Sequence, residues 1–303
     1  MTVQTVSRFL DLRALAALAH MRFTTRHRIE GNYSGRHQSR QQGGAGEFVD
    51  FREYSGGEDL RRLDWKVYSR TGKAIVRLHQ DETNLLCTMA IDVSGSMRFG
   101  ERSAQDGRGS KLEYAQYLAT ALSYVICLGQ DQVGAALLRG DDVESIPPGS
   151  TPNHLARVQE MIEQPVTQQA TVMAPALRKL FERSSRRGVL VLMSDFLMED
   201  LEDVFAALRL FRHRGWEVAA LHLVHPREER LPEGMAYRFE GLEGEGSVNC
   251  SPAEIEAAYR DRLAAHMAAV RQLALGVGCD YRLVNTAVGY LQTLGGFLVE
   301  RTG

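Results

Sequence analysis

The sequence predicts an α/β protein: a doubly wound, mostly parallel sheet flanked by helices, preceded by an N-terminal accessory segment. Two continuous apolar runs, Leu85–Ile91 and Gly188–Met193, are typical of strands that are buried on both faces. From residue 84 onward, strand-like and helix-like segments alternate, which is the order of a parallel sheet with crossover helices. This region of about 220 residues is long enough to bury one large core.

The predicted strands are short and apolar, and the segments between them carry apolar stripes at helical spacing. We expect strands at Leu85–Ile91, Gln132–Leu138, Asp142–Ile146 (an edge strand), Gly188–Met193, Glu217–Val224 and Tyr281–Val284. We expect helices at Lys111–Leu128, His154–Ile162, Ala174–Ser184, Leu201–His213, Ala253–Leu275 and Val288–Glu300.

The chain before this pattern has a different character, so we divide it into an accessory segment, residues 1–83, and a sheet domain, residues 84–303. Leucines near helical spacing predict a short amphipathic helix over residues 7–21. Residues 22–46 are rich in Arg, Gln, Gly and Ser without a period, which predicts an extended or mobile segment. Ala74–Leu78 is a strand-like run.

Composition is that of an ordinary globular protein, with 44% hydrophobic and 24% charged residues among 303, which excludes disorder, collagen and a coiled-coil rod. The formal net charge of −2 argues against a dedicated nucleic-acid binder. The charge is divided unevenly, because residues 1–81 hold 14 Lys and Arg against nine Asp and Glu. We expect this basic excess to mark an arm, an interface or a segment docked on the acidic remainder.

The four cysteines lie far apart and form no C-x-x-C pair, which indicates reduced thiols in a cytosolic protein. No apolar run approaches the ~20 residues that cross a bilayer. The N-terminal apolar stretch contains Asp11 and Arg13, unlike a signal peptide. We therefore expect a cytoplasmic protein.

Oxygen-bearing side chains follow two of the apolar runs. Asp92, Ser94 and Ser96 come directly after the first, and Asp195 follows the second. Ligands of open α/β sheets bind beyond the carboxyl ends of strands, so we expect these side chains to converge. With Thr171, which precedes a predicted helix, they form a set of two carboxylates and three hydroxyls. Such a set suits a hard divalent cation, Mg²⁺ above all, with Mn²⁺ and Ca²⁺ as alternatives.

Two other interpretations compete with a metal site. The first is a serine-rich turn in which Asp92 only caps the backbone. The second is a metal-dependent phosphatase or hydrolase, but Ser94 stands where a dehalogenase-like phosphatase needs its second Asp. Neither Ser94 nor Ser96 has the flanking glycines of a serine-hydrolase elbow, and the chain has no P-loop. We therefore expect no enzymatic activity.

Taken together, Asp92-Val93-Ser94-Gly95-Ser96, Thr171 and Asp195 resemble the metal-ion-dependent adhesion site of von Willebrand factor A-like domains. Further motifs resemble the signature of domain-of-unknown-function family 58. These are Gly35-x-His37-x-Ser39, Gly46-Glu47-Phe48, Phe51-Arg52-x-Tyr54, Gly57-x-Asp59-x-Arg61, Leu63-Asp64-Trp65, Ser69-Arg70, the layout from Lys179 to Asp195, Pro226-x-Glu228 and Leu231-Pro232.

The resemblance implies a bacterial protein with a von Willebrand A-like fold that acts as an adaptor or co-chaperone of a MoxR-type AAA+ ATPase. It implies that Ser94 and Ser96 bind the cation through their hydroxyls, and that Asp92 and Asp195 bind it directly or through water. Thr171 would join when a partner binds, and an acidic side chain of that partner would fill the open position. Thr171 stands in Ala170-Thr171-Val172, where the family pattern is Gly-Thr-Asp or Gly-Thr-Asn.

Three further features are the basic segment, Trp65 and an acidic loop. The basic segment Arg22–Arg40, with Phe23 and Tyr33 interleaved, suits either single-stranded nucleic acid or an arm docked on the acidic body. Trp65 suits a buried anchor or a partner contact. Glu240–Gly246 is interpreted as a solvated acidic loop.

Overall fold

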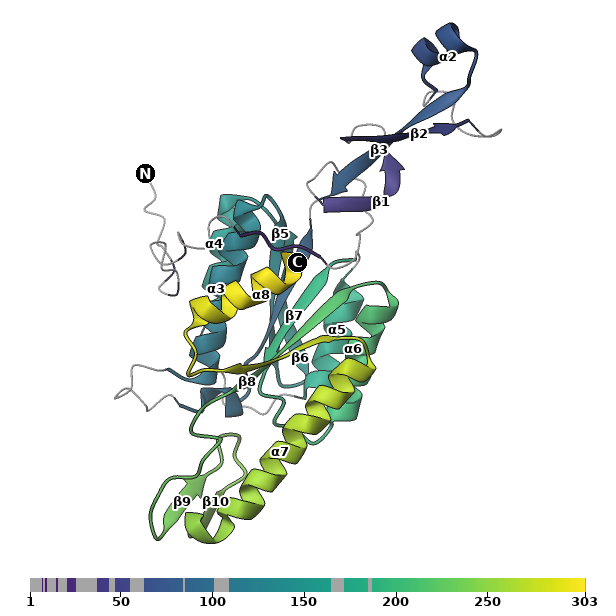
Figure 1. Cartoon of the computed structure of the whole chain (residues 1–303). Coiled ribbons are helices and arrows are strands. Elements are labelled where there is room, and N and C mark those ends of the chain that lie inside the picture. The colour runs from purple at the N-terminus through teal and green to yellow at the C-terminus, as the bar shows by residue number, and fades with distance from the viewer. Residues whose placement is uncertain are drawn as a thin grey trace, which may run out of the picture. The chain divides into compact units, whose positions relative to one another are not determined.

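The structure is a computed structural model, and it contains two compact units (Figure 1). The larger unit comprises Met1–Phe23 and Leu86–Gly303, and the smaller comprises Thr24–Leu85. The structure describes residues 7, 9, 15, 21–25, 37–43, 47–54, 63–83, 85–100, 109–164, 172–184 and 187–302, with the backbone alone at 37–43, 47–52, 76–83 and 302.

The larger unit is built on a six-stranded sheet with the order β11-β8-β7-β4-β5-β6. Neighbouring strands are parallel, except that the edge strand β6 runs antiparallel to β5. The strands are β4 (Leu86–Asp92), β5 (Gln132–Arg139), β6 (Asp142–Gly149), β7 (Val189–Ser194), β8 (Glu217–Val224) and β11 (Asp280–Asn285). A separate hairpin is formed by β9 (Tyr237–Glu240) and β10 (Ser247–Cys250).

Helices cover both faces of this sheet (Figure 1). They are α3 (Lys111–Leu128), α4 (Pro152–Ile162), α5 (Met173–Arg183), α6 (Leu201–His213), α7 (Pro252–Gly276) and α8 (Tyr290–Thr302), with a short 3-10 turn, η3 (Ser96–Arg98), after β4. On one face, α5, α6 and α7 pack over a buried cluster that includes Leu190, Leu192 and Phe211. On the other, α3 contacts β4 and β5 and packs beside α4 and α8.

This architecture confirms the predicted fold class. β7 and β8 are buried along their whole length because helices cover them on both sides, which explains their continuous apolar sequences. The predicted edge strand is β6, and it extends to Gly149 through Pro147 and Pro148, which an edge strand tolerates. The β9–β10 hairpin is an element that the sequence did not predict, since its strands are only four residues long and mostly exposed, which is too short a run for a period of two to stand out.

The smaller unit contains a three-stranded antiparallel sheet with the order β1-β3-β2. Its elements are β1 (His37–Gly43), β2 (Glu47–Glu53), α2 (Trp65–Thr71) and β3 (Ile75–Thr83). The Asp64 side chain caps α2 by accepting hydrogen bonds from the amides of Lys66 and Val67 at 3.0 and 3.1 Å. The Trp65 ring is 58% exposed and lies edge-on to Tyr68.

Several N-terminal side chains are buried in the larger unit. Phe9 packs edge-on against Tyr117 with 4.8 Å between ring centroids, and Phe23 contacts Phe297 at 5.8 Å. The sequence pattern places these residues in the accessory segment, whereas in the structure residues 1–23 belong to the same compact unit as the sheet. Most of the predicted helix at 7–21 lies outside the described residues. Among the described helices, none is long and apolar enough to span a membrane.

Candidate metal centre

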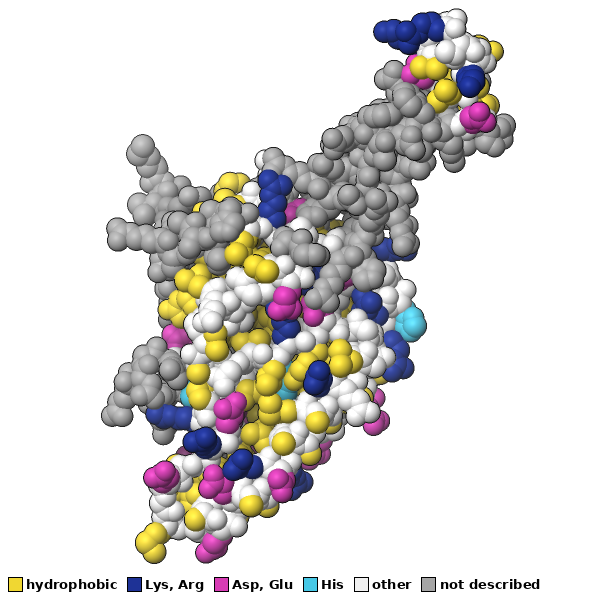
Figure 2. Space-filling view, in the orientation of Figure 1, with side chains coloured by type: hydrophobic (Ala, Val, Ile, Leu, Met, Phe, Trp, Pro, Cys, Tyr) yellow, Lys and Arg dark blue, Asp and Glu magenta, His cyan; other side chains and the backbone are white. Residues whose placement is uncertain are grey.

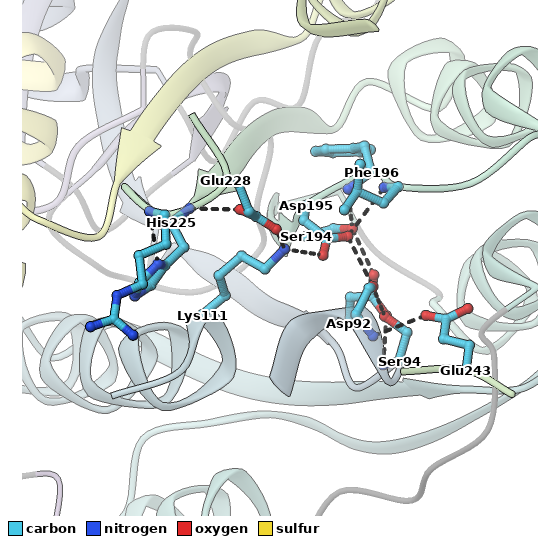
Figure 3. A network of polar contacts seen from close by, with 12 residues as sticks. Asp92, Ser94, Lys111, Ser194, Asp195, Phe196, His225, Glu228 and Glu243 are labelled. Carbon is cyan, nitrogen blue, oxygen red and sulfur yellow. Dashed lines mark hydrogen bonds and ion pairs between the residues drawn. The ribbon is translucent and has the colours of Figure 1, made fainter. Parts of the chain in front are cut away.

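The carboxyl ends of β4 and β7 bring together four of the five predicted site residues (Figure 3). The Ser94 and Ser96 hydroxyl oxygens lie 3.1 Å apart, and the Ser96 hydroxyl donates to Asp195 Oδ1 at 3.3 Å. Asp92, at the end of β4, accepts a hydrogen bond from the Ser94 amide at 3.0 Å. The fifth residue, Thr171, lies outside the described residues.

The spacing of these oxygens fits a small hard cation. In an octahedron with Mg–O distances near 2.1 Å, neighbouring ligand oxygens lie about 3 Å apart. The oxygen pairs Ser94–Ser96 and Ser96–Asp195 match that separation. Burial, together with the nearby Asp195 carboxylate, raises the pKa of Asp92 to about 6, so a cation here would relieve repulsion between the two carboxylates.

Ser194 fixes the position of Asp92. Its buried hydroxyl donates to Asp92 Oδ2 at 2.7 Å and accepts a hydrogen bond from the Phe196 amide at 2.9 Å. Phe196 is fully buried with φ of 53°, a left-handed conformation that costs of order 1 kcal/mol or more for such a residue. The strained turn aims Asp195 at the serines, and the Leu197 amide donates to its Oδ1 at 3.1 Å.

A buried lysine faces the other side of Asp195. Ser110 caps α3 by accepting a hydrogen bond from the Glu113 amide, which places Lys111 at the first position of the helix. The Lys111 ammonium donates to Asp195 Oδ2 at 2.6 Å and to Glu228. Burial acts to lower the pKa of Lys111, but the two carboxylates outweigh it and keep the pKa above its ordinary value.

The charges of this cluster do not balance. Asp92, Asp195 and Glu228 bring three carboxylates to one buried ammonium, so the cluster carries −2 when all are ionised. Glu228 is held in place by the His225 amide, which donates to its Oε2 at 2.7 Å. A divalent cation between the serines and the aspartates would bring the cluster to neutrality.

A fourth carboxylate reaches the site from the β9–β10 hairpin. The Ser96 amide donates to Glu243 Oε1 at 3.1 Å (Figure 3). The sequence predicts a solvated loop at Glu240–Gly246, and the structure corrects that prediction for Glu243, which is only partly exposed.

A pocket of about 360 Å³ opens on the far side of Asp195. Its lining includes His222, Glu228, Tyr259 and His266. Burial, reinforced by His266, lowers the pKa of His222 to about 4, so this imidazole is neutral at pH 7. Within the described part of the chain, no group of three or more His, Cys, Asp or Glu side chains is arranged to hold a metal ion. The candidate centre differs from such groups because two of its four side chains are serines, which bind through hydroxyl oxygens.

Sequence reasoning missed Lys111, Ser194 and Glu243 as members of the site. Ser194 was the easiest of the three to predict from the sequence, since it directly precedes Asp195 at the end of an apolar strand. Lys111 begins a predicted helix, where a lysine is normally solvated, and nothing in the pattern indicates its burial. Glu243 comes from a hairpin that the sequence did not predict.

Comparison with known proteins gives one family match and several relatives. The sequence model of a family described as "Protein of unknown function DUF58" matches residues 50–272. Uncharacterized proteins of Mycobacterium tuberculosis (strain H37Rv) and Mycobacterium bovis are each 27% identical to this chain over 304 residues. Each match covers 96% of this chain and 90% of the relative.

Solved structures are similar at lower identity. An aerotolerance-related membrane protein from Bacteroides fragilis matches 71% of this chain and 98% of its own, with a TM-score of 0.48 and 18% identity. BatB from Bacteroides thetaiotaomicron matches the same shares with a TM-score of 0.44 and 16% identity. The von Willebrand A domain of SpRpn10 matches 70% of this chain and 94% of its own, with a TM-score of 0.39 and 12% identity.

Proposed function

Because this chain belongs to the DUF58 family, whose function is unknown, we propose a role for its von Willebrand A-like larger unit: a non-enzymatic, metal-dependent protein-interaction module. The observation that supports the proposal best is the octahedral spacing of the Ser94, Ser96 and Asp195 oxygens at the carboxyl ends of β4 and β7. A bound Mg²⁺ would supply an electrophilic centre for one more oxygen ligand.

The protein's own residues have separate roles in this proposal. Ser94 and Ser96 bind through neutral hydroxyls, which leave the charge of the ion available to a partner. Asp92 and Asp195 hold the ion directly or through water. Of the two carboxylate oxygens of Asp195, Lys111 binds Oδ2, so it fixes the orientation of the carboxylate while Oδ1 faces Ser96.

The partner we propose is a MoxR-type AAA+ ATPase, on the strength of the resemblance described above. An acidic side chain of that partner would complete the coordination, so that ion binding and partner binding are thermodynamically linked. Since such an ATPase consumes ATP, the two proteins would meet in the cytoplasm. We propose no catalytic step, because the site pairs its aspartates with serines and lacks the second Asp of a phosphatase.

Calorimetric titration with Mg²⁺ tests the metal centre. We expect the native chain to bind one ion, and Asp92→Ala and Ser94→Ala to weaken binding at least 10-fold, since each removes an oxygen of the set. Asp141→Ala is the matched control, because this aspartate is exposed and lies outside the cluster. Circular dichroism establishes that each variant is folded. Equal Mg²⁺ affinities in the native chain and both site variants would overturn the proposal.

Affinity capture from the native cell tests the partner separately. We expect the native chain to retain an AAA+ ATPase in Mg²⁺ and to lose it in chelator, and we expect Asp92→Ala to retain none. Failure to recover such an ATPase under either condition contradicts the partner assignment. Phosphatase or esterase turnover that Asp92→Asn abolishes would contradict the non-enzymatic role.

A further inference from the structure

The β9–β10 hairpin contacts the D-x-S-x-S loop, Asp92–Ser96. Glu243, in the turn of the hairpin, accepts a hydrogen bond from the Ser96 amide, so its carboxylate lies next to the residue whose hydroxyl faces Ser94 and Asp195. Contact between the two loops is close. A Cβ atom added to Gly95 would lie 2.3 Å from the Leu242 carbonyl oxygen and 2.9 Å from Glu243 Cγ. Only glycine at residue 95 lets the hairpin approach this far.

The turn of the hairpin is shaped to present this carboxylate. The Gly241 amide donates to the Gly246 carbonyl at 2.7 Å and closes the turn, while Gly244 and Gly246 both adopt φ of +95°. The Glu243 amide donates to the Glu245 carboxylate at 2.9 Å. With the turn closed in this way, the Glu243 side chain accepts the hydrogen bond from the D-x-S-x-S loop.

From this geometry we infer that Glu243, which bonds the Ser96 amide in the metal-free chain, exchanges that bond for the open position of the cation when the ion binds, so that the hairpin covers the site until a partner carboxylate displaces it. The inference rests on the proposed function, because it requires the cation. The cluster of Asp92, Asp195, Glu228 and Lys111 carries −2 when all its members are ionised. A divalent ion would neutralise that charge, and Glu243 would add one further negative charge.

The hairpin is suited to being displaced. Its strands are four residues each and mostly exposed: Val248 in β10 is 65% exposed, and Met235, two residues before β9, is 92% exposed. Figure 2 shows acidic, basic and apolar side chains at the solvent surface of this projecting end of the molecule. An element with so few buried contacts opens at low cost, which a competing carboxylate requires.

Mn²⁺ is the probe that tests this inference, because the relaxation of water protons reports how many exchangeable waters the bound ion holds. We compare the native chain with Glu243→Gln and with Glu240→Gln, an exposed carboxylate of the same hairpin that forms only a 3.7 Å ion pair with Arg238. We expect Glu243→Gln to weaken Mn²⁺ binding about 10-fold and to admit one more water to the ion. Added acetate should displace that water at lower concentration than in the native chain.

The outcomes separate the two proposals. If Mn²⁺ binds and Glu243→Gln matches both the native chain and Glu240→Gln in affinity and hydration, Glu243 is not a ligand and the proposed metal centre stands. If Mn²⁺ binds to none of the three proteins at millimolar concentration, the metal centre itself is wrong and this inference falls with it. Mn²⁺ binding with the extra water confined to Glu243→Gln supports both.

Discussion

Two buried ion clusters, one around Arg301 (the arginine cluster) and one around Lys111 (the lysine cluster), lie at opposite ends of the same sheet and differ in net charge. At the amino ends of the strands, Arg301 binds Glu217 at 2.5 Å and Asp280 at 3.5 Å. At the carboxyl ends, Lys111 binds Asp195 and Glu228, and Asp92 adds a third carboxylate that has no cation of its own among the described residues. The excess of carboxylate over cation is therefore larger where ligands of such sheets bind.

The surroundings of the two cations differ as well. The Arg301 guanidinium lies over the rings of Phe23 and Phe297, at 4.7 and 5.2 Å from their centroids, so it ties α8 and the N-terminal residues to the sheet. Lys111 instead binds Asp195, which directly precedes the strained Phe196, and both of its carboxylate partners line a pocket. We infer that the arginine cluster holds the fold together, while the lysine cluster maintains a site at the expense of stability.

The largest expected effect comes from removing each cation in turn. Lys111→Met and Arg301→Met should each lower the free energy of unfolding by about 3–5 kcal/mol, because each leaves buried carboxylates unpaired. Urea unfolding at pH 7 measures both. The effect of Mg²⁺ on stability distinguishes the two clusters. At 100 times its dissociation constant, Mg²⁺ should raise the free energy of unfolding of the native chain and of Arg301→Met by about 2.7 kcal/mol each.

Lys111→Met should gain more from Mg²⁺ than either of those proteins at the same concentration. Without the Lys111 ammonium, the three carboxylates of the lysine cluster carry −3 when ionised, so the cluster should bind the ion more tightly. Equal gains in Lys111→Met and Arg301→Met would break the comparison, since they would show that the lysine cluster does not face the cation.

A smaller effect distinguishes a buried serine that serves the site from one that does not. Ser194→Ala leaves Asp92 Oδ2 and the Phe196 amide without the hydroxyl that both contact, so we expect a loss of about 1–3 kcal/mol. Ser123→Ala removes a buried hydroxyl that donates to the Ala119 carbonyl of its own helix at 2.6 Å. That carbonyl keeps its helical amide partner, so the loss should be smaller, about 0.5 kcal/mol. Comparable losses in urea unfolding would show that Ser194 has no special role.

Periodicity and apolar runs predict most of the larger unit, because helices and doubly covered strands carry their burial in local sequence. α3, α6 and β8 have the predicted bounds, and the D-x-S-x-S loop lies at the predicted end of β4. The features of the site that the sequence did not predict depend on tertiary contacts. Lys111 is buried only because Asp195 and Glu228 come from other strand ends, and no local pattern encodes that meeting.

For a related reason, the charge pattern does not predict that Glu243 contacts the site. A glycine-rich acidic turn is normally solvated, and its local sequence does not show that Gly95, almost 150 positions earlier, leaves room for it. The strain at Phe196 is hidden in the same way. Its ring stacks on Phe205 at 5.7 Å and contacts His222 at 5.4 Å, and this packing holds a backbone conformation that the residue alone disfavours.

The smallest expected effect concerns Gln130, the other described residue besides glycine with positive φ, at 64°. It lies in an exposed turn before β5, at the amino end of the sheet. Gln130→Gly removes the left-handed strain and increases the freedom of the unfolded chain, so we expect a net gain of about 0.5 kcal/mol in unfolding free energy. Phe196→Gly relieves similar strain but loses a buried ring and should cost about 3 kcal/mol or more. A gain at Phe196 would mean that packing does not hold the site turn in its strained form.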